Sequence, residues 1–126
     1  MERCRLTITT NADGQVSTLT KDGAFVLGVA FAEICYEDGN ASVAIKIENG
    51  CAHITRKGDY TLALQLKKGE RTEGALGIMD SEGKVYTKTD KLEYAIQENS
   101  VMLLAHYDLI VGGEIQKMQV RIFAKK

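Results

Sequence analysis

The sequence predicts an all-β protein, an antiparallel up-and-down β-barrel of about 8–10 strands. Glycines that lie among Asp, Asn, Lys, Glu or Ser recur along the chain, and short segments that alternate apolar and polar residues separate them. Turn signals at intervals of roughly 8–12 residues are typical of sandwiches and barrels. The connections are short, which favours sequential antiparallel neighbours, and a long meander removes its edges by closing. A two-sheet sandwich needs longer crossovers.

The predicted strands begin near the N-terminus. Residues 3–10 place Cys4, Leu6 and Ile8 on one face, which indicates a half-buried strand. Residues 15–20 form a polar strand that we expect Lys21-Asp22-Gly23 to end with a turn. Residues 24–36 are apolar on both faces, and their β-favouring side chains predict either two strands or one strand bent at Gly28.

The middle of the chain carries the clearest hairpin signal. Residues 42–48 alternate, Asn49-Gly50 follows at once, and residues 51–56 form the next strand. Asn-Gly supplies the two residues of positive φ that a type I′ turn needs, so the two segments should pair antiparallel. The strand that starts at Tyr60 then points Leu62, Leu64 and Leu66 to the same side, and we expect it to anchor the core.

The C-terminal half continues the pattern. We predict strands over residues 72–79, 85–89, 92–97, 101–111 and 118–124, with a last hairpin turn at Gly112-Gly113. No segment of helical length shows the 3.6-residue period, and no proline interrupts the strands.

Length and charge bound the partners of the protein. The 126 residues fit a single barrel domain, residues 1–126. Sixteen Lys and Arg against seventeen Asp and Glu leave a net charge of −1 and no basic field for nucleic acid. Gly28 and Glu33 break the longest apolar stretch, which is too short to span a membrane. The N-terminus has no export signal, so we expect a cytoplasmic protein in which Cys4, Cys35 and Cys51 are reduced thiols. We expect no cofactor.

Chemistry-bearing residues are few. Cys51 and His53 share one strand face, and so do His106 and Asp108, but neither pair has the spacing of a zinc motif, and we expect no metal site. The sequence has no nucleophile elbow, phosphate loop or dinucleotide fingerprint, so no catalytic residue is assigned and an enzyme built on His106 and Asp108 is the third hypothesis. Arg56-Lys57 is interpreted as a solvated charge at a hairpin tip.

Ligand binding is the first functional hypothesis. A barrel of this size either fills with its own side chains or holds one small molecule, and both arrangements fit the inward residues. Tyr60, Tyr94 and Tyr107 are the candidate ligand-binding residues at a barrel mouth, because each joins an apolar ring to a polar tip suited to a small apolar or amphipathic ligand. The alternative is an interaction module, either a monomer or a homodimer, that uses Phe123, Leu104 and Ile110 on the outer face.

Several stretches resemble a known family. They are Leu6-Thr7-Ile8-Thr9-Thr10, Tyr60-Thr61-Leu62-Ala63-Leu64 followed by Gly69-Glu70-Arg71-Thr72, Val85-Tyr86-Thr87-Lys88-Thr89 with Leu92, and Tyr107-Asp108-Leu109 through Gly113. Together they resemble the YwiB-like family of uncharacterised bacterial proteins with a calycin, or lipocalin-like, β-barrel. Where relatives carry an aromatic-Pro-Tyr-Gly turn, this chain has residues 77–83, Gly-Ile-Met-Asp-Ser-Glu-Gly. The resemblance implies a cytoplasmic barrel and no known activity.

Overall fold

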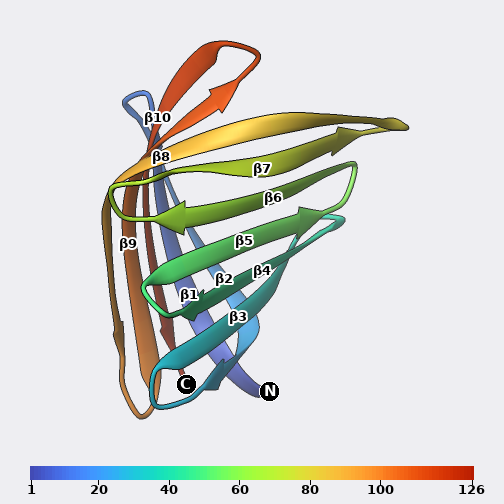
Figure 1. Cartoon of the computed structure of the whole chain (residues 1–126). Coiled ribbons are helices and arrows are strands. Elements are labelled where there is room, and N and C mark those ends of the chain that lie inside the picture. The colour runs from blue at the N-terminus through green and yellow to red at the C-terminus, as the bar shows by residue number, and fades with distance from the viewer.

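The structure, a computed structural model that describes residues 1–126, is a closed barrel of ten antiparallel strands (Figure 1). It contains no helix with the length and apolarity that crossing a membrane requires. The strands are β1 (Glu2–Ala12), β2 (Gln15–Leu27), β3 (Phe31–Asp38), β4 (Ala41–Glu48), β5 (Cys51–Lys57), β6 (Tyr60–Lys67), β7 (Arg71–Ile78), β8 (Ser81–Ile96), β9 (Ser100–Val111) and β10 (Glu114–Lys125). The all-β, up-and-down prediction is confirmed.

The barrel closes through β1, which lies between β2 and β10. In the ladder with β10, Arg5 pairs with Lys125 at one end and Ala12 with Met118 at the other. The ladder with β2 runs along the whole of β1. Every strand therefore has a neighbour on each side, although β3 pairs only with residues 23–27 of β2 and leaves residues 15–22 unpaired on that side.

The hairpins alternate between two ends of the barrel. The turns that follow β1, β3, β5, β7 and β9 form one end, which we call the distal end. The turns that follow β2, β4, β6 and β8 lie at the other end, where both chain termini also lie (Figure 1), and we call this the terminal end. This alternation decides which side chains meet at each mouth of the barrel.

Two tight turns, at Asn49-Gly50 and Gly112-Gly113, form where the sequence predicts them. Asn49 and Gly50 have φ angles of 53° and 73°, and Gly112 and Gly113 have φ angles of 57° and 83°. Two successive residues of positive φ are the requirement of a type I′ hairpin, whose twist matches that of the flanking strands. These two turns therefore fix β4 beside β5 and β9 beside β10.

Inward-facing residues form one core of 20 buried side chains. Cys4, Leu6 and Ile8 of β1 are buried, as the alternation predicts, and so are Leu64 and Leu66 of β6. Further buried residues come from β9 and β10, namely Val101, Leu103, Ala105, Tyr107, Ile122 and Ala124. The middle of the barrel is therefore packed by its own side chains.

The predicted turn at Lys21-Asp22-Gly23 is wrong, because β2 runs straight through these residues. Gly23 instead lies where atoms of the neighbouring strands β1 and β3 come too close for a side chain. A Cβ atom at Gly23 would lie 2.5 Å from the carbonyl oxygen of Cys35 and 2.5 Å from Cδ1 of Leu6. The turn comes later, between β2 and β3, so residues 24–36 form parts of two strands, one of the two arrangements the sequence allows.

The separate strands predicted at residues 85–89 and 92–97 are also wrong, because both belong to the long strand β8. Its register against β9 shifts between Thr89 and Lys91, which marks a β-bulge. The extra residue keeps both Thr89 and Leu92 on the inner face, although they are three positions apart. A spacing that breaks the alternation in the sequence is thus a bulge rather than a turn.

Candidate functional site

Charged and phenolic side chains occupy inward positions at the distal end of the barrel. Lys21 of β2 pairs with the buried Leu6, and Arg56 of β5 pairs with Leu62. Tyr36 of β3 pairs with the buried Val43. Residues that pair across neighbouring strands share a face, so all three side chains start on the inner face of the sheet.

Lys21 and Asp38 form an ion pair at this end. Lys21 Nζ lies 3.1 Å from Asp38 Oδ1, and the lysine side chain is only 24% exposed. Burial, and to a smaller degree the charge of Asp38, raise the pKa of the Tyr36 phenol above its usual value. Tyr36 is therefore a neutral hydrogen-bond donor and acceptor beside a charged pair.

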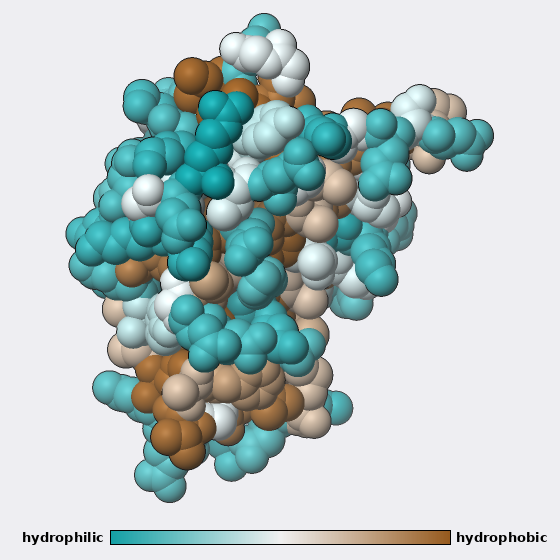
Figure 2. Space-filling model, in the orientation of Figure 1, coloured by the Kyte–Doolittle hydropathy of each residue, from teal (hydrophilic) through white to brown (hydrophobic).

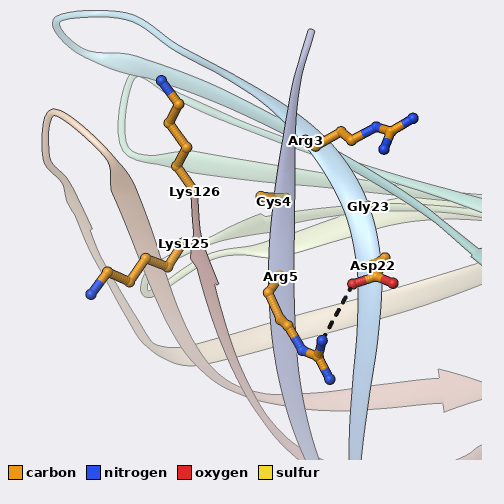
Figure 3. Close-up of a pocket in the computed structure, with 7 residues that line it drawn as sticks. All are labelled: Arg3, Cys4, Arg5, Asp22, Gly23, Lys125 and Lys126. Atoms are coloured by element: carbon orange, nitrogen blue, oxygen red, sulfur yellow. Dashed lines mark ion pairs between the residues drawn. The ribbon is translucent and has the colours of Figure 1, made fainter.

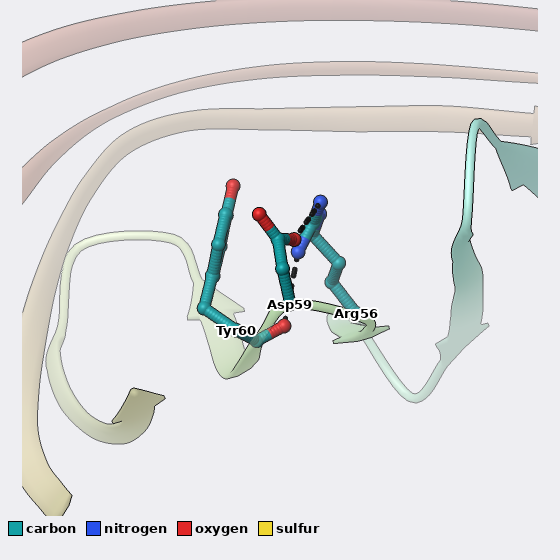
Figure 4. Close-up of polar contacts among 3 residues, drawn as sticks. All are labelled: Arg56, Asp59 and Tyr60. Carbon is teal, nitrogen blue, oxygen red and sulfur yellow. Dashed lines mark hydrogen bonds and ion pairs between the residues drawn. The ribbon is translucent and has the colours of Figure 1, made fainter. Parts of the chain in front are cut away.

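Arg56 makes the second charged contact, across the β5–β6 hairpin (Figure 4). Nη2 donates to Asp59 Oδ1 at 3.0 Å, and Nη1 donates to the Tyr60 carbonyl at 2.9 Å. The guanidinium carbon lies 3.7 Å from the centroid of the Tyr60 ring, so the group is held against that ring. The hydrogen bond from Arg56 lowers the pKa of the Asp59 carboxyl.

Gly58 lies close to the start of β4. A Cβ atom there would lie 2.8 Å from Cβ of Ala41 and 3.4 Å from Nη1 of Arg56. The β5–β6 hairpin thus packs closely on the start of β4, where Ala41 pairs with Asp38. We call the set Lys21, Tyr36, Asp38, Arg56, Asp59 and Tyr60 the mouth cluster.

Apolar side chains complete the distal end. Leu62 lies beside Arg56, and Leu76 of β7 pairs with Leu62. Both are only partly buried, although they face inward. Leu64, the next inward residue of β6, is 5% exposed and belongs to the core. The distal mouth is therefore amphipathic and ends on a packed floor.

The three predicted tyrosines lie at different places. Tyr60 belongs to the mouth cluster. Tyr94 faces the terminal end, where its hydroxyl accepts a hydrogen bond of 3.0 Å from the backbone N–H of Gly50. Tyr107 is 6% exposed inside the barrel, and burial raises its pKa to about 12. The structure does not bring the three together.

The interpretation of Arg56 as a solvated charge at a hairpin tip is wrong, because its side chain faces inward and is 19% exposed. The alternation held the signal for this placement: Ala52 and Ile54 face the core, and Arg56 has the same parity. Lys21 was hidden by the false turn predicted around it. Continuing the inward–outward alternation of each strand through its charged residues would have predicted the inward positions of Lys21 and Arg56.

The two polar pairs found in the sequence lie on the outer face and far apart. Cys51 and His53 belong to β5, His106 and Asp108 to β9, and three strands separate them in the sheet. Asp108 contacts Lys117 Nζ at 3.4 Å and has no hydrogen bond to a histidine. No three His, Cys, Asp or Glu side chains gather as metal ligands would.

A surface depression of about 520 Å³ lies at the terminal end. It is lined by Arg3, Cys4, Arg5, Asp22, Gly23, Lys125 and Lys126. Its cationic side chains point in different directions (Figure 3), and the Arg5–Asp22 ion pair of 3.8 Å is exposed. Cations that diverge into solvent do not converge on one ligand, so the mouth cluster is the better candidate site.

The outer surface also carries exposed apolar residues. Phe123 is 41% exposed on β10, while Leu104 and Ile110 of β9 are half-buried. A second group, Val26 and the fully exposed Val29, lies at the terminal end, where Figure 2 shows apolar residues gathered beside polar ones.

Comparisons with known proteins support the fold and the family. Residues 3–122 match the family described as a domain of unknown function, DUF1934. The chain is similar to the crystal structure of the ywiB protein from Bacillus subtilis, with a TM-score of 0.84 and 17% sequence identity over 98% of this chain and 91% of that chain. No curated protein matches the chain. The family match spans almost the whole sequence, so the chain belongs to the DUF1934 family, with the YwiB-like barrel that its strand and turn residues resemble.

Proposed function

We propose that the protein binds a small amphipathic ligand at the distal mouth of its barrel. One observation carries the proposal: charged side chains occupy inward positions there, directly beside partly buried leucines. Both cations, Lys21 and Arg56, are already paired with carboxylates, and apolar side chains lie beside them. A ligand with an apolar part and a polar part would cover both kinds of side chain.

The packed core limits where such a ligand sits. Leu64 and Ile45 are buried below the mouth, so the apolar part rests on Leu62 and Leu76 without entering the barrel. Tyr60 offers a ring and a hydroxyl at the rim. In this proposal Tyr94 closes the opposite end and Tyr107 supports the floor of the site. The three free cysteines fit a cytoplasmic protein.

A neutral solvatochromic probe, Nile red, tests the proposal. We expect the protein to raise its emission saturably, and Leu76→Gln to weaken binding about tenfold, because a polar amide replaces apolar contact area. Ile115→Gln is the matched control, since Ile115 is 59% exposed on the outer face of β10 and should leave binding unchanged. Equal binding by all three proteins would contradict a site at the distal mouth.

A second proposal is an interaction module, favoured by the exposed Phe123. In this proposal two copies meet through the outer faces of β9 and β10, where Leu104 and Ile110 add apolar area. Native mass spectrometry should show a dimer that Phe123→Ser converts to a monomer. A monomer at every concentration of the unaltered protein would rule out the homodimer.

A further inference from the structure

We infer that Arg56 recognises an anionic head group, a carboxylate or a phosphate, and that Asp59 occupies the place of that group while the site is empty. The inference deepens the proposed function and rests on it, because it assigns the chemistry of the ligand's polar part. Its basis is the unused hydrogen-bonding capacity of Arg56, the exposure of Asp59, and the register of β5 with β6.

Arg56 has donors to spare. A guanidinium carries five N–H groups, and only two hydrogen bonds link Arg56 to the chain, one to Asp59 and one to the Tyr60 carbonyl. The side chain is nevertheless four-fifths buried. Its plane is fixed against the Tyr60 ring. A planar, oriented guanidinium with free donors is suited to a carboxylate or phosphate, which it can hold by two parallel hydrogen bonds.

Asp59 is a replaceable partner. Its side chain is 83% exposed and lies in the turn of the hairpin, and Arg56 is its only side-chain partner. The Asp59 carboxylate is largely hydrated already, so an incoming anion that displaces it from Arg56 loses little. Lys21 differs, because the side chain of its partner Asp38 is 50% exposed, against 83% for Asp59. Arg56 is therefore the cation that is available to bind the anionic group of a ligand.

The register supplies the apolar half of the specificity. Leu62 pairs with Arg56, and Leu76 pairs with Leu62, so an alkyl chain that starts at the guanidinium passes over two leucines. The buried Leu64, two residues further along β6 than Leu62, bounds this path on the side of the core. The ligand class is thus a short-chain amphiphile with an anionic head.

Isothermal titration calorimetry of the full chain tests the inference with decanoate, decyl phosphate and the neutral decanol. We expect at least one anion to bind more tightly than decanol. Arg56→Gln should weaken binding of that anion by about 10- to 100-fold, the usual effect of losing hydrogen bonds to a charged group, and leave decanol unchanged. Asp59→Asn should tighten anion binding by up to about tenfold, because the internal competitor is gone.

Arg71→Gln is the matched control. Arg71 also lies over a tyrosine ring, 4.6 Å from the centroid of Tyr86, but it is exposed on the outer face of β7. This variant should bind all three ligands as the unaltered protein does. Asp59→Asn keeps the inference testable if Arg56→Gln does not fold, since an unchanged affinity for anions in that variant overturns it.

The outcomes separate the two proposals. If decanol binds as tightly as both anions and neither Arg56→Gln nor Asp59→Asn changes any affinity, the anion inference is wrong while the mouth site stands. If none of the three ligands binds and Nile red also fails, the proposed function itself is wrong. Preference for decanoate over decyl phosphate, or the reverse, identifies which head group Arg56 selects.

Discussion

Where β6 and β7 separate, two threonine hydroxyls donate hydrogen bonds to a carbonyl that the ladder between the strands leaves unpaired. The ladder between these strands ends at Ala63 opposite Ala75. Two residues further on, the carbonyl of Gln65 is contacted by the hydroxyls of Thr72 and Thr87, the latter at 2.9 Å. The hydroxyls also contact each other at 2.6 Å. Each hydroxyl has one proton to donate, and both hydroxyls lie within hydrogen-bonding distance of the same Gln65 carbonyl.

We therefore predict that Thr72→Val and Thr87→Val are coupled. Either change alone leaves one hydroxyl for the carbonyl and should lower the free energy of unfolding by about 1 kcal/mol or less. Both changes together leave the acceptor unpaired in a partly buried place, which adds roughly 1–3 kcal/mol. The double variant should lose at least about 1 kcal/mol more than the sum of the single variants.

Urea denaturation of the four proteins measures this coupling. Thr89→Val is the matched comparison, because Thr89 lies on the same inner face of β8 and its buried hydroxyl has no partner. That change should leave stability equal or raise it by up to about 1 kcal/mol, since an unpaired buried hydroxyl is costly. The shared-carbonyl argument is refuted if the loss of unfolding free energy in the double variant equals the sum of the losses in the two single variants to within about 0.5 kcal/mol.

Two further predictions concern Tyr107 and Gly74. Because burial raises the Tyr107 pKa to about 12 against about 10 when unfolded, its stabilisation is complete below pH 10 and falls by roughly 2–3 kcal/mol as pH approaches 12. Alkaline unfolding should show this loss, and Tyr107→Phe should lack it; equal pH profiles would contradict the burial argument. A Cβ on Gly74 would collide with the carbonyl oxygen of Ala63, so Gly74→Ala should cost about 1–3 kcal/mol. Gly83→Ala, where nothing lies within 4 Å, should cost nothing in the same melts.

The fold was predictable because turn chemistry and alternation are local properties. Asn49-Gly50 requires positive φ at two residues whatever surrounds it, so the hairpin could be placed without the rest of the chain. Gly23 shows the limit of this reasoning. Its glycine is needed because Leu6 and the Cys35 carbonyl approach from neighbouring strands, and the sequence around it does not record that contact.

The bulge in β8 was missed for a related reason. Thr89 and Leu92 both point inward, and only the paired strand β9 shows that Asp90 is the inserted residue. For the mouth cluster too, the sequence shows one part of the arrangement and only the structure shows the other. The inward parity of Arg56 is present in the sequence, whereas the close approach of Gly58 to Ala41 depends on the register between β4 and β5.

The tyrosines at the two ends of the barrel make different contacts. At the terminal end the Tyr94 hydroxyl crosses to the backbone of Gly50, which ties β8 to the β4–β5 turn and uses the polar tip of the ring for closure. At the distal end Tyr60 makes no such tie, and its ring holds the Arg56 guanidinium instead. A polar group whose hydrogen bonds are all made within the protein stabilises the fold, whereas a group with free donors can bind a ligand. By this criterion the distal mouth, rather than the terminal end, is where we propose that a small molecule binds.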